Sequence, residues 1–239
     1  GDAPSSVAVG AGAVWVANFN DDDVVRVDPL SGKATAKIPV GNGPFSVAVG
    51  EGAVWVANQF DDAVVRIDPG TNRVGKSIPV GDRPLAVAVG EGAVWVFNSI
   101  AGTVARIDPR TGKVVSTSPP VVERSGTPDY TGLAVADGSV WVSSPSEGTV
   151  VRIDARSNRP VGKPIKVGAG PFGIEVVEGL VWVANFDGGT VARIDARTGR
   201  LRGKPITVGG QPIALAAGGG AVWVVSASGT VTRIDPTSS

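Results

Sequence analysis

The sequence predicts an all-β protein: a six-bladed β-propeller whose blades are four-stranded antiparallel sheets. Three observations point to this fold. First, tryptophan recurs about every 40 residues. Second, each tryptophan is followed by a tripeptide made of Arg, then Val or Ile, then Asp, which we call the second phrase. Third, each repeat divides into four apolar runs separated by turn residues.

The tryptophans stand in nearly the same phrase each time, for example AVWVAN at 13–18 and 53–58 and LVWVAN at 180–185. Two markers that recur six times in a fixed order indicate a repeat protein. The tryptophans are Trp15, Trp55, Trp95, Trp141, Trp182 and Trp223, with spacings of 40, 40, 46, 41 and 41 residues. The second phrase carries Arg26 and Asp28, Arg66 and Asp68, Arg106 and Asp108, Arg152 and Asp154, Arg193 and Asp195, and Arg233 and Asp235.

The second repeat shows how the four strands of a blade are expected to follow one another. Its apolar runs cover 46–50, 53–58, 64–68 and 74–80, with short polar or glycine-containing turns between them. Along the second run Val54 and Val56 point to one face and Trp55 to the other, so both faces need cover. Radial stacking of blades supplies that cover, whereas the rival β-solenoid usually has shorter coils.

The whole chain, 1–239, is predicted to form one propeller domain. Its repeats begin near residues 4, 44, 84, 128, 171 and 212. The chain ends at Ser239, directly after the third strand of the sixth repeat. We therefore expect a three-stranded sixth blade, or one completed by a strand from outside the sequence, as in a domain excised from a longer protein.

Composition excludes several classes of function. Lys plus Arg and Asp plus Glu both number 22, and no basic run occurs, which argues against a nucleic-acid partner. No apolar stretch approaches the roughly 18 residues of a membrane span, so direct membrane insertion is not expected. The chain has neither cysteine nor histidine, which removes disulfides, imidazole bases and histidine metal ligands. We expect no catalytic residue, no metal and no cofactor.

Most of the recurring polar residues have a structural interpretation. Each Asp of the second phrase is expected to open a turn, with a metal role as the lesser alternative. The amides three residues after tryptophan are expected to bond the loop backbone, or alternatively to form a ring at a channel mouth. These amides are Asn18, Asn58, Asn98 and Asn185.

The phrase P-x-x-V-A-V-G-x-G-x-V-W-V-A-N followed by R-I-D-P resembles the NHL, YVTN and virginiamycin B lyase-like propeller repeats. The resemblance covers essentially the whole chain and implies a propeller. Members of these groups include streptogramin lyases, periplasmic and surface propellers, and extracellular sensor domains of bacterial Ser/Thr kinases. The resemblance thus favours an extracellular or periplasmic location, for example in the ectodomain of a membrane-anchored protein.

The resemblance also implies a metal-dependent chemistry that this sequence does not match. The lyases have seven blades and use a catalytic histidine with a bound metal. This chain has six repeats and no histidine, so no lyase catalytic residue is carried over to it.

One end of the predicted blades varies between repeats and gathers most of the Phe and Tyr residues, which suggests a ligand-binding face with aromatic anchors. The alternative is that each ring packs the mouth of its own blade. Both interpretations remain open. The candidate residues of this face are Phe19, Asn20, Asp21, Phe45, Phe60, Asp61, Arg83, Tyr130, Phe172, Phe186, Asp187 and Gln211.

Glu175 is an exception among equivalent positions, because the residue seven before tryptophan is alanine in the other five repeats. It is expected on an innermost strand beside the central channel. A buried carboxylate without a partner is costly, so Glu175 should face water, pair with a cation or contact a ligand or ion.

Three hypotheses for function follow. The first is a non-enzymatic recognition or sensor propeller that binds a peptide, glycan or protein at the variable end. The second is a metal-dependent lyase or lactonase-like enzyme, which the lack of histidine disfavours. The third is an assembly module that self-associates through the open edge of the sixth blade.

Overall fold

The computed structural model describes residues 1–122 and 131–237. These residues form 24 β-strands, and none of their segments is a helix that could cross a membrane. The chain divides into two compact units, Gly1–Pro120 and Val121–Ser239. Each unit contains three blades, which we number in chain order.

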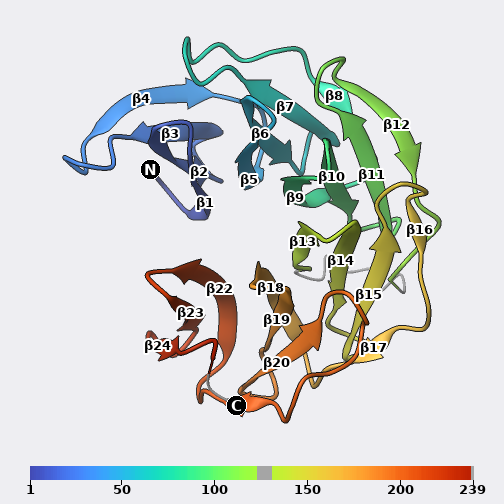
Figure 1. Cartoon of the computed structure of the whole chain (residues 1–239). Helices are drawn as coiled ribbons and strands as arrows, with labels where there is room; N and C mark the ends of the chain where they lie inside the picture. Colours follow the sequence, from blue (N-terminus) through green and yellow to red (C-terminus); the bar gives the residue numbers. More distant parts are fainter. Residues whose placement is uncertain (123–130, 238–239) are drawn as a thin grey trace. The chain divides into compact units, whose positions relative to one another are not determined.

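The first unit holds blades 1 to 3, each a four-stranded antiparallel sheet. The first strand β5 contacts the first strands β1 and β9 of the two neighbouring blades, and the fourth strands lie at the far side of each blade (Figure 1). The strands are β1 Pro4–Gly10, β2 Ala13–Asn18, β3 Asp23–Val27, β4 Ala34–Pro39, β5 Pro44–Gly50, β6 Ala53–Asn58, β7 Ala63–Ile67, β8 Ile78–Pro79, β9 Pro84–Gly90, β10 Ala93–Asn98, β11 Thr103–Asp108 and β12 Lys113–Thr117.

The second unit holds blades 4 to 6. Blade 4 has two short outer strands, β16 and β17, which both pair with β15, whereas blade 6 has three strands. The strands are β13 Leu133–Ala136, β14 Ser139–Ser144, β15 Thr149–Asp154, β16 Arg159–Pro160, β17 Ile165–Lys166, β18 Pro171–Val177, β19 Leu180–Asn185, β20 Thr190–Asp195, β21 Ile206–Thr207, β22 Pro212–Gly218, β23 Ala221–Ser226 and β24 Val231–Ile234.

The predicted fold class is therefore confirmed as an all-β, six-bladed β-propeller, including the three-stranded sixth blade. Five predicted repeat starts coincide with the first residues of β1, β5, β9, β18 and β22. The start predicted near residue 128 lies outside the described residues. The assignment of the chain to a single domain stays a prediction.

Strand register gives every blade two different apolar faces. In blade 2, Trp55 stands opposite Ala48 and Arg66 on neighbouring strands, while Val54 stands opposite Val49 and Ile67. Because side chains alternate along a strand, these two sets point to opposite sides of the sheet. We call the side with tryptophan the Trp face and the side with the valines the Val face.

The core of each unit is formed where the Trp face of one blade packs on the Val face of the next. Trp15 of blade 1 shares a cluster with Val54 and Val56 of blade 2. In the second unit Trp182 of blade 5 packs against Val222 and Val224 of blade 6. The blade 2–3 and blade 4–5 contacts follow the same pattern. The prediction that tryptophan packs between blades is confirmed.

A glycine supports the tryptophan in four blades. The indole nitrogens of Trp15, Trp55, Trp95 and Trp223 each donate to the carbonyl of the glycine five residues earlier, at 3.0–3.2 Å. A Cβ atom on Gly10 would lie 2.6 Å from Val49 of the next blade, so the strand end approaches too closely for a larger residue. In blades 4 and 5 this position is Ala136 or Val177, and there the buried indole nitrogen has no hydrogen-bond partner.

The aspartates of the second phrase are turn residues, as predicted. One carboxylate oxygen of Asp154 accepts hydrogen bonds from the amides of Arg156 and Ser157 and from the hydroxyl of Ser157, at 2.7–3.2 Å. The bond from the Ser157 amide is the main reason that the pKa of Asp154 lies below its usual value. The pKa values of Asp28, Asp68, Asp108, Asp195 and Asp235 are lowered in the same way by their own turns.

The asparagines after tryptophan bond the backbone inside the blades. The side-chain amides of Asn58, Asn98 and Asn185 donate to the carbonyls of Val40, Val80 and Val167 at 2.7–3.1 Å. Asn18 instead donates to the carboxylate of Asp23 at 2.7 Å. All four asparagines are buried, which supports the structural interpretation.

Two tryptophan truncations test the face-to-face packing. Trp182 is fully buried, whereas Trp223 of blade 6 is 39% exposed. Trp182→Ala should lower the free energy of unfolding by about 3–5 kcal/mol, because it leaves a cavity between blades 5 and 6. Trp223→Ala should cost less than half as much. Urea titrations followed by circular dichroism measure both, and equal losses would contradict the packing scheme.

Candidate functional site

Three phenylalanines predicted for the variable end meet in the first unit. Phe19 lies in the turn between β2 and β3, Phe45 in β5, and Phe60 in the turn between β6 and β7. The ring centroids of Phe19 and Phe45 are 6.2 Å apart in an edge-to-face arrangement, and those of Phe19 and Phe60 are 5.6 Å apart. We call these three residues the aromatic cluster. It joins blades 1 and 2 at one end of the unit.

The backbone beneath the aromatic cluster requires glycine. Gly43 has a φ of 62°, and a Cβ atom there would lie 2.7 Å from the Phe60 ring and 3.2 Å from the Phe19 ring. The carbonyl of Gly43 accepts a hydrogen bond from the amide of Gln59 at 3.0 Å. The loop before β5 thus lies directly against both rings and holds them in place.

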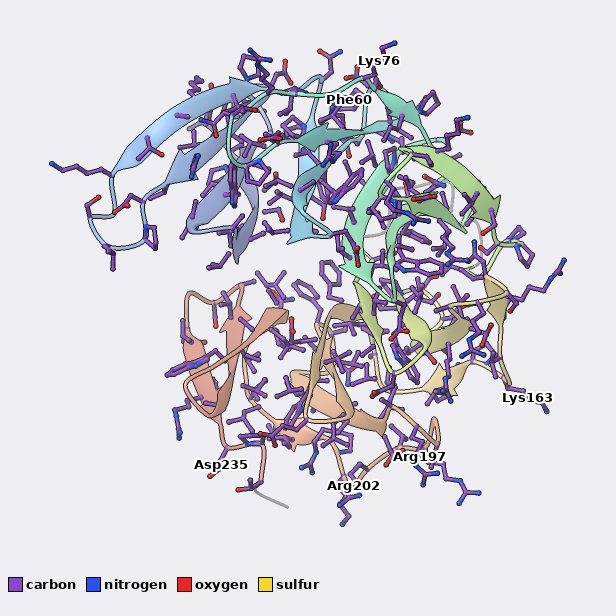
Figure 2. All side chains as sticks on the ribbon, turned by 45° about the horizontal axis from the view of Figure 1, so that its top comes forward. Phe60, Lys76, Lys163, Arg197, Arg202 and Asp235 are labelled. Atoms are coloured by element: carbon purple, nitrogen blue, oxygen red, sulfur yellow. The ribbon has the colours of Figure 1, made fainter. Side chains whose placement is uncertain are left out.

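The aromatic cluster is only partly covered. Phe19 and Phe45 are half-buried, whereas Phe60 is 56% exposed. Figure 2 marks Phe60 on the first unit. Phe19 and Phe45 therefore fit the packing interpretation in part, while the exposed Phe60 ring, which packs beside Phe19, provides a surface suited to an apolar or aromatic group.

Arg83 borders the cluster. Its guanidinium lies 5.8 Å from the centroid of the Phe60 ring. Its backbone amide donates to the carboxylate of Asp62 at 2.8 Å, and its φ is 53°, an uncommon value for a residue with a side chain. The loop before β9 therefore places a cation over the exposed ring of blade 2.

The carboxylates near the cluster are engaged by neighbouring segments of the chain. Asp61 accepts hydrogen bonds from the backbone amide and side-chain amide of Asn42, at 2.8 and 2.6 Å. Asp21 accepts from the amide of Asp2 at 3.0 Å and pairs with Lys37 at 3.4 Å. The Asp2 bond is the largest cause of the lowered pKa of Asp21. Asp21 and Asp61 therefore mainly fix neighbouring segments of the chain to one another through hydrogen bonds.

The remaining candidates have separate positions. Asn20 is exposed and bonds the Asp2 carboxylate at 3.3 Å. In the second unit Phe172 of β18 and Phe186 stack at 5.1 Å, and the exposed Asp187 follows Phe186 in the turn after β19. The carbonyl of Gln211 accepts from the amide of Ala227 at 2.8 Å. Tyr130 lies outside the described residues.

Glu175 lies on β18, the first strand of blade 5, opposite Trp182. It is partly buried, and this burial raises its pKa above the ordinary value of 4.5, although a hydrogen bond from the Val176 amide acts in the opposite direction. Among residues 1–122 and 131–237, no three carboxylates come together in a way that could hold a metal ion. Glu175 therefore belongs to no metal-binding group of carboxylates in the described part of the chain.

The arginine of the second phrase has a role that the sequence analysis did not assign. The guanidinium groups of Arg26, Arg106, Arg152 and Arg193 lie 5.3–5.6 Å from the ring centroid of the tryptophan in their own blade. Arg26 also donates to the carbonyl of Pro69 and to Asn72 in the next blade, at 3.0 and 3.1 Å. The constant spacing of tryptophan and arginine could have revealed this pairing.

Grooves also occur at the opposite end of the blades, beside these arginines. One groove of about 530 Å³ lies between blades 2 and 3, and another of about 480 Å³ lies between blades 4 and 5. In the second, Arg197 and Arg202 extend outward from the unit (Figure 2). Both grooves hold an arginine of the second phrase, Arg106 or Arg152, and an Asp of that phrase. Because they are built from recurring scaffold residues, they are weaker candidates than the aromatic cluster.

Comparison with known proteins supports the fold. The profile of the virginiamycin B lyase family matches residues 1–239. No curated protein sequence matches the chain. A solved structure titled streptogramin B lyase is similar with a TM-score of 0.81 at 16% identity, over 100% of this chain and 84% of that one.

Two further solved structures are similar at the same level. Hydrazine synthase from Kuenenia stuttgartiensis has a TM-score of 0.81 at 18% identity, over 98% of this chain and 76% of that one. A catalytically inactive histidine-to-alanine variant of virginiamycin B lyase from Staphylococcus aureus, solved with quinupristin, has a TM-score of 0.81 at 14% identity, over 98% of this chain and 80% of that one. At these identities the similarity concerns the fold.

Replacing Glu175 with glutamine tests its environment. Well below pH 4.5 the folded and unfolded states both hold the proton, so the raised pKa of Glu175 has no effect on stability. As the pH rises, the unfolded state releases its proton first, and the free energy of unfolding of the wild type falls until the folded-state pKa is passed. The Glu175→Gln variant has no carboxyl group at this position, so its free energy of unfolding does not fall in this way.

The free energy of unfolding of the variant minus that of wild type should therefore be larger at pH 7 than at pH 4. Urea titrations at the two pH values measure this difference. Glu178→Gln, on an exposed turn of the same blade, serves as the matched control. A stability difference that does not change with pH would show that Glu175 ionises freely in the folded chain.

Proposed function

Because the chain belongs to the virginiamycin B lyase family, we propose that it uses the family's propeller for recognition rather than for the lyase reaction. The ligand is a peptide segment of a larger partner or a free peptide that presents an aromatic or apolar side chain. It binds at the aromatic cluster of the first unit. A glycan would use the same ring surface and is the alternative ligand.

The exposed ring of Phe60 carries this proposal. A large apolar side chain that is 56% exposed, rests on a second ring and lies under a guanidinium differs from an isolated surface phenylalanine. Rigid aromatic anchors beside arginine are typical of the residues that dominate binding energy. The glycine and carboxylate bonds of the surrounding loops order this surface before a ligand arrives, which lowers the entropic cost of binding.

Arg83 would add recognition of a negatively charged group on the ligand. Its guanidinium can donate to a carboxylate of the ligand while it remains stacked on Phe60. Asp21 and Asp61 are already held by neighbouring amides and Lys37, so they contribute less to an incoming cation. An aromatic residue next to an acidic one is therefore the preferred ligand sequence.

The lyase reaction is the second candidate because the family and its solved members include enzymes. The Staphylococcus aureus enzyme is described as catalytically inactive after replacement of one histidine, and this chain contains no histidine. The metal implied by the resemblance does not fit the side chains found, since the described part of the chain has no group of three or more carboxylates that could hold a metal ion, and the sequence has no histidine or cysteine. No step through a metal is therefore derived.

We also propose that recognition takes place outside the cytoplasm, as in a sensor or interaction domain of a larger protein. The resemblance of the repeats to surface and sensor propellers motivates this location. A fusion of the chain's native open reading frame to alkaline phosphatase, which is active only when exported, tests it. Lack of phosphatase activity would contradict the proposal.

A phage-displayed library of random dodecapeptides tests ligand binding. The wild-type chain should enrich peptides with an aromatic residue beside Asp or Glu. Phe60→Ala should weaken binding of the selected peptides about 30-fold, since a central aromatic anchor contributes about 2 kcal/mol. Leu30→Ala is the control, because Leu30 is 96% exposed in a turn at the other end of blade 1.

Peptide affinities are measured by isothermal titration calorimetry, and thermal melts show whether each variant folds. Arg83→Gln should mainly weaken peptides that carry an acidic residue. If Phe60→Ala retains the same peptides with unchanged affinity, the aromatic cluster is not the binding surface.

Quinupristin turnover tests the alternative function directly. The purified chain, incubated with quinupristin and Mg²⁺ at neutral pH, should leave the compound unchanged in liquid chromatography. The Staphylococcus aureus enzyme serves as the positive control. Loss of quinupristin above the rate in buffer would overturn the recognition proposal and favour the lyase.

A further inference from the structure

The outer segments of blades 4 and 5 carry a concentration of positive charge that the balanced total charge of the chain conceals. In each blade this segment runs from the residue after the Asp of the second phrase to the end of the outer strand. The segments are 29–39, 69–79, 109–117, 155–166 and 196–207. None of them contains Asp or Glu, but blades 1, 2 and 3 have two basic residues each, whereas blades 4 and 5 have four each.

The eight basic residues of blades 4 and 5 form one surface of the second unit, which we call the basic edge. All eight are exposed. The two segments meet, because a Cβ atom on Gly199 of blade 5 would lie 3.8 Å from Ile165 of blade 4. Figure 2 shows that three of these side chains extend outward from the unit. The eight residues are Arg156, Arg159, Lys163, Lys166, Arg197, Arg200, Arg202 and Lys204.

Nearby carboxylates compensate only part of this charge. Asp154 and Asp195 stand at the start of the two segments, and each accepts hydrogen bonds from its own turn. Asp137 and Glu178 line the groove between blades 4 and 5. Eight cations against these four carboxylates still leave a surplus of four positive charges. Since the segments themselves contain no acid, that surplus lies on their outer side.

Each of the two segments also exposes an aliphatic side chain among its cations. Val161 lies between two basic residues of blade 4 and is 46% exposed, and Leu201 lies directly between two arginines of blade 5 and is 50% exposed. A soluble polyanion gains little from an aliphatic group. The interface of a bilayer takes up both kinds of side chain, with cations at the lipid phosphates and aliphatic groups at the acyl boundary. The combination therefore favours an anionic lipid surface.

We propose that the basic edge, together with Val161 and Leu201, binds peripherally to a bilayer that contains anionic phospholipid. The Lys and Arg side chains meet the lipid phosphates, and the two aliphatic side chains enter the boundary beneath the headgroups. Each cation close to such a surface strengthens binding about fivefold. The basic edge lies in the second unit and the aromatic cluster in the first, so lipid and peptide contact different residues.

Co-sedimentation with sucrose-loaded vesicles tests the binding. Wild type should bind vesicles in which phosphatidylglycerol replaces a third of the phosphatidylcholine, and it should not bind vesicles of phosphatidylcholine alone. Binding should weaken as salt is added, because salt screens exposed charges. A chain that binds neither kind of vesicle, or both equally well, would overturn the proposal.

Two double variants that remove the same charge locate the contact. Lys163→Gln with Arg202→Gln takes one cation from each segment of the basic edge and should weaken binding to the phosphatidylglycerol vesicles about 25-fold. Arg73→Gln with Lys76→Gln, in the outer segment of blade 2, is the matched control and should bind within about twofold of wild type. All four side chains are exposed, and circular dichroism checks that each variant folds. Equal losses in the two double variants would contradict a contact at the basic edge.

Leu201→Gln separates a bilayer from a soluble polyanion. It should weaken vesicle binding about fivefold, because the bilayer covers the exposed half of this side chain. Its binding to soluble polyphosphate should equal that of wild type. If wild type binds polyphosphate but no vesicles, or if Leu201→Gln binds vesicles like wild type, the partner is not a lipid surface. The peptide experiments contain no lipid, so they and this one can fail independently.

Discussion

The packing of a tryptophan-bearing face on a valine-bearing face is the interaction on which the remaining structure depends. A sheet of three or four short strands buries too little by itself, and each blade has two apolar faces, so it needs a neighbour on either side. The arginine and aspartate that follow each tryptophan serve the same need for contact between neighbouring blades. The arginine lies on the tryptophan and reaches the next turn, while the aspartate shapes the turn in its own blade.

This division of labour leaves the loops free to differ. Strand residues are committed to contacts between blades, and Asn58, Asn98 and Asn185 tie the loops back to the strands. The aromatic cluster is therefore held by an ordered scaffold although its residues come from two turns and a strand. In repeat proteins, divergent loops on a shared scaffold commonly carry function, and the fold alone does not establish it.

Much of the fold could be predicted from the sequence, because the same strand and turn pattern occurs in six repeats and each repeat supports the same assignment. The alternation around Trp55, the turn role of Asp154 and the three strands of blade 6 were all predicted from local pattern. The sequence predicted that Phe19, Phe45 and Phe60 lie at the same end of the blades, but it did not predict the contacts between their rings. The stacking of Arg83 on Phe60 depends on a positive φ at Arg83, which residue types alone do not indicate.

The unequal cover of the six tryptophans gives the chain a built-in optical signal. Five indole rings are fully buried, and Trp223 meets solvent. A small quencher such as acrylamide would reach Trp223 and leave the other emission largely intact, so the fluorescence of the folded protein divides into one accessible and one protected fraction. Whatever comes to rest on the last blade would shield Trp223 and shift its emission to shorter wavelength. Occupancy of that face can therefore be followed in the unlabelled protein.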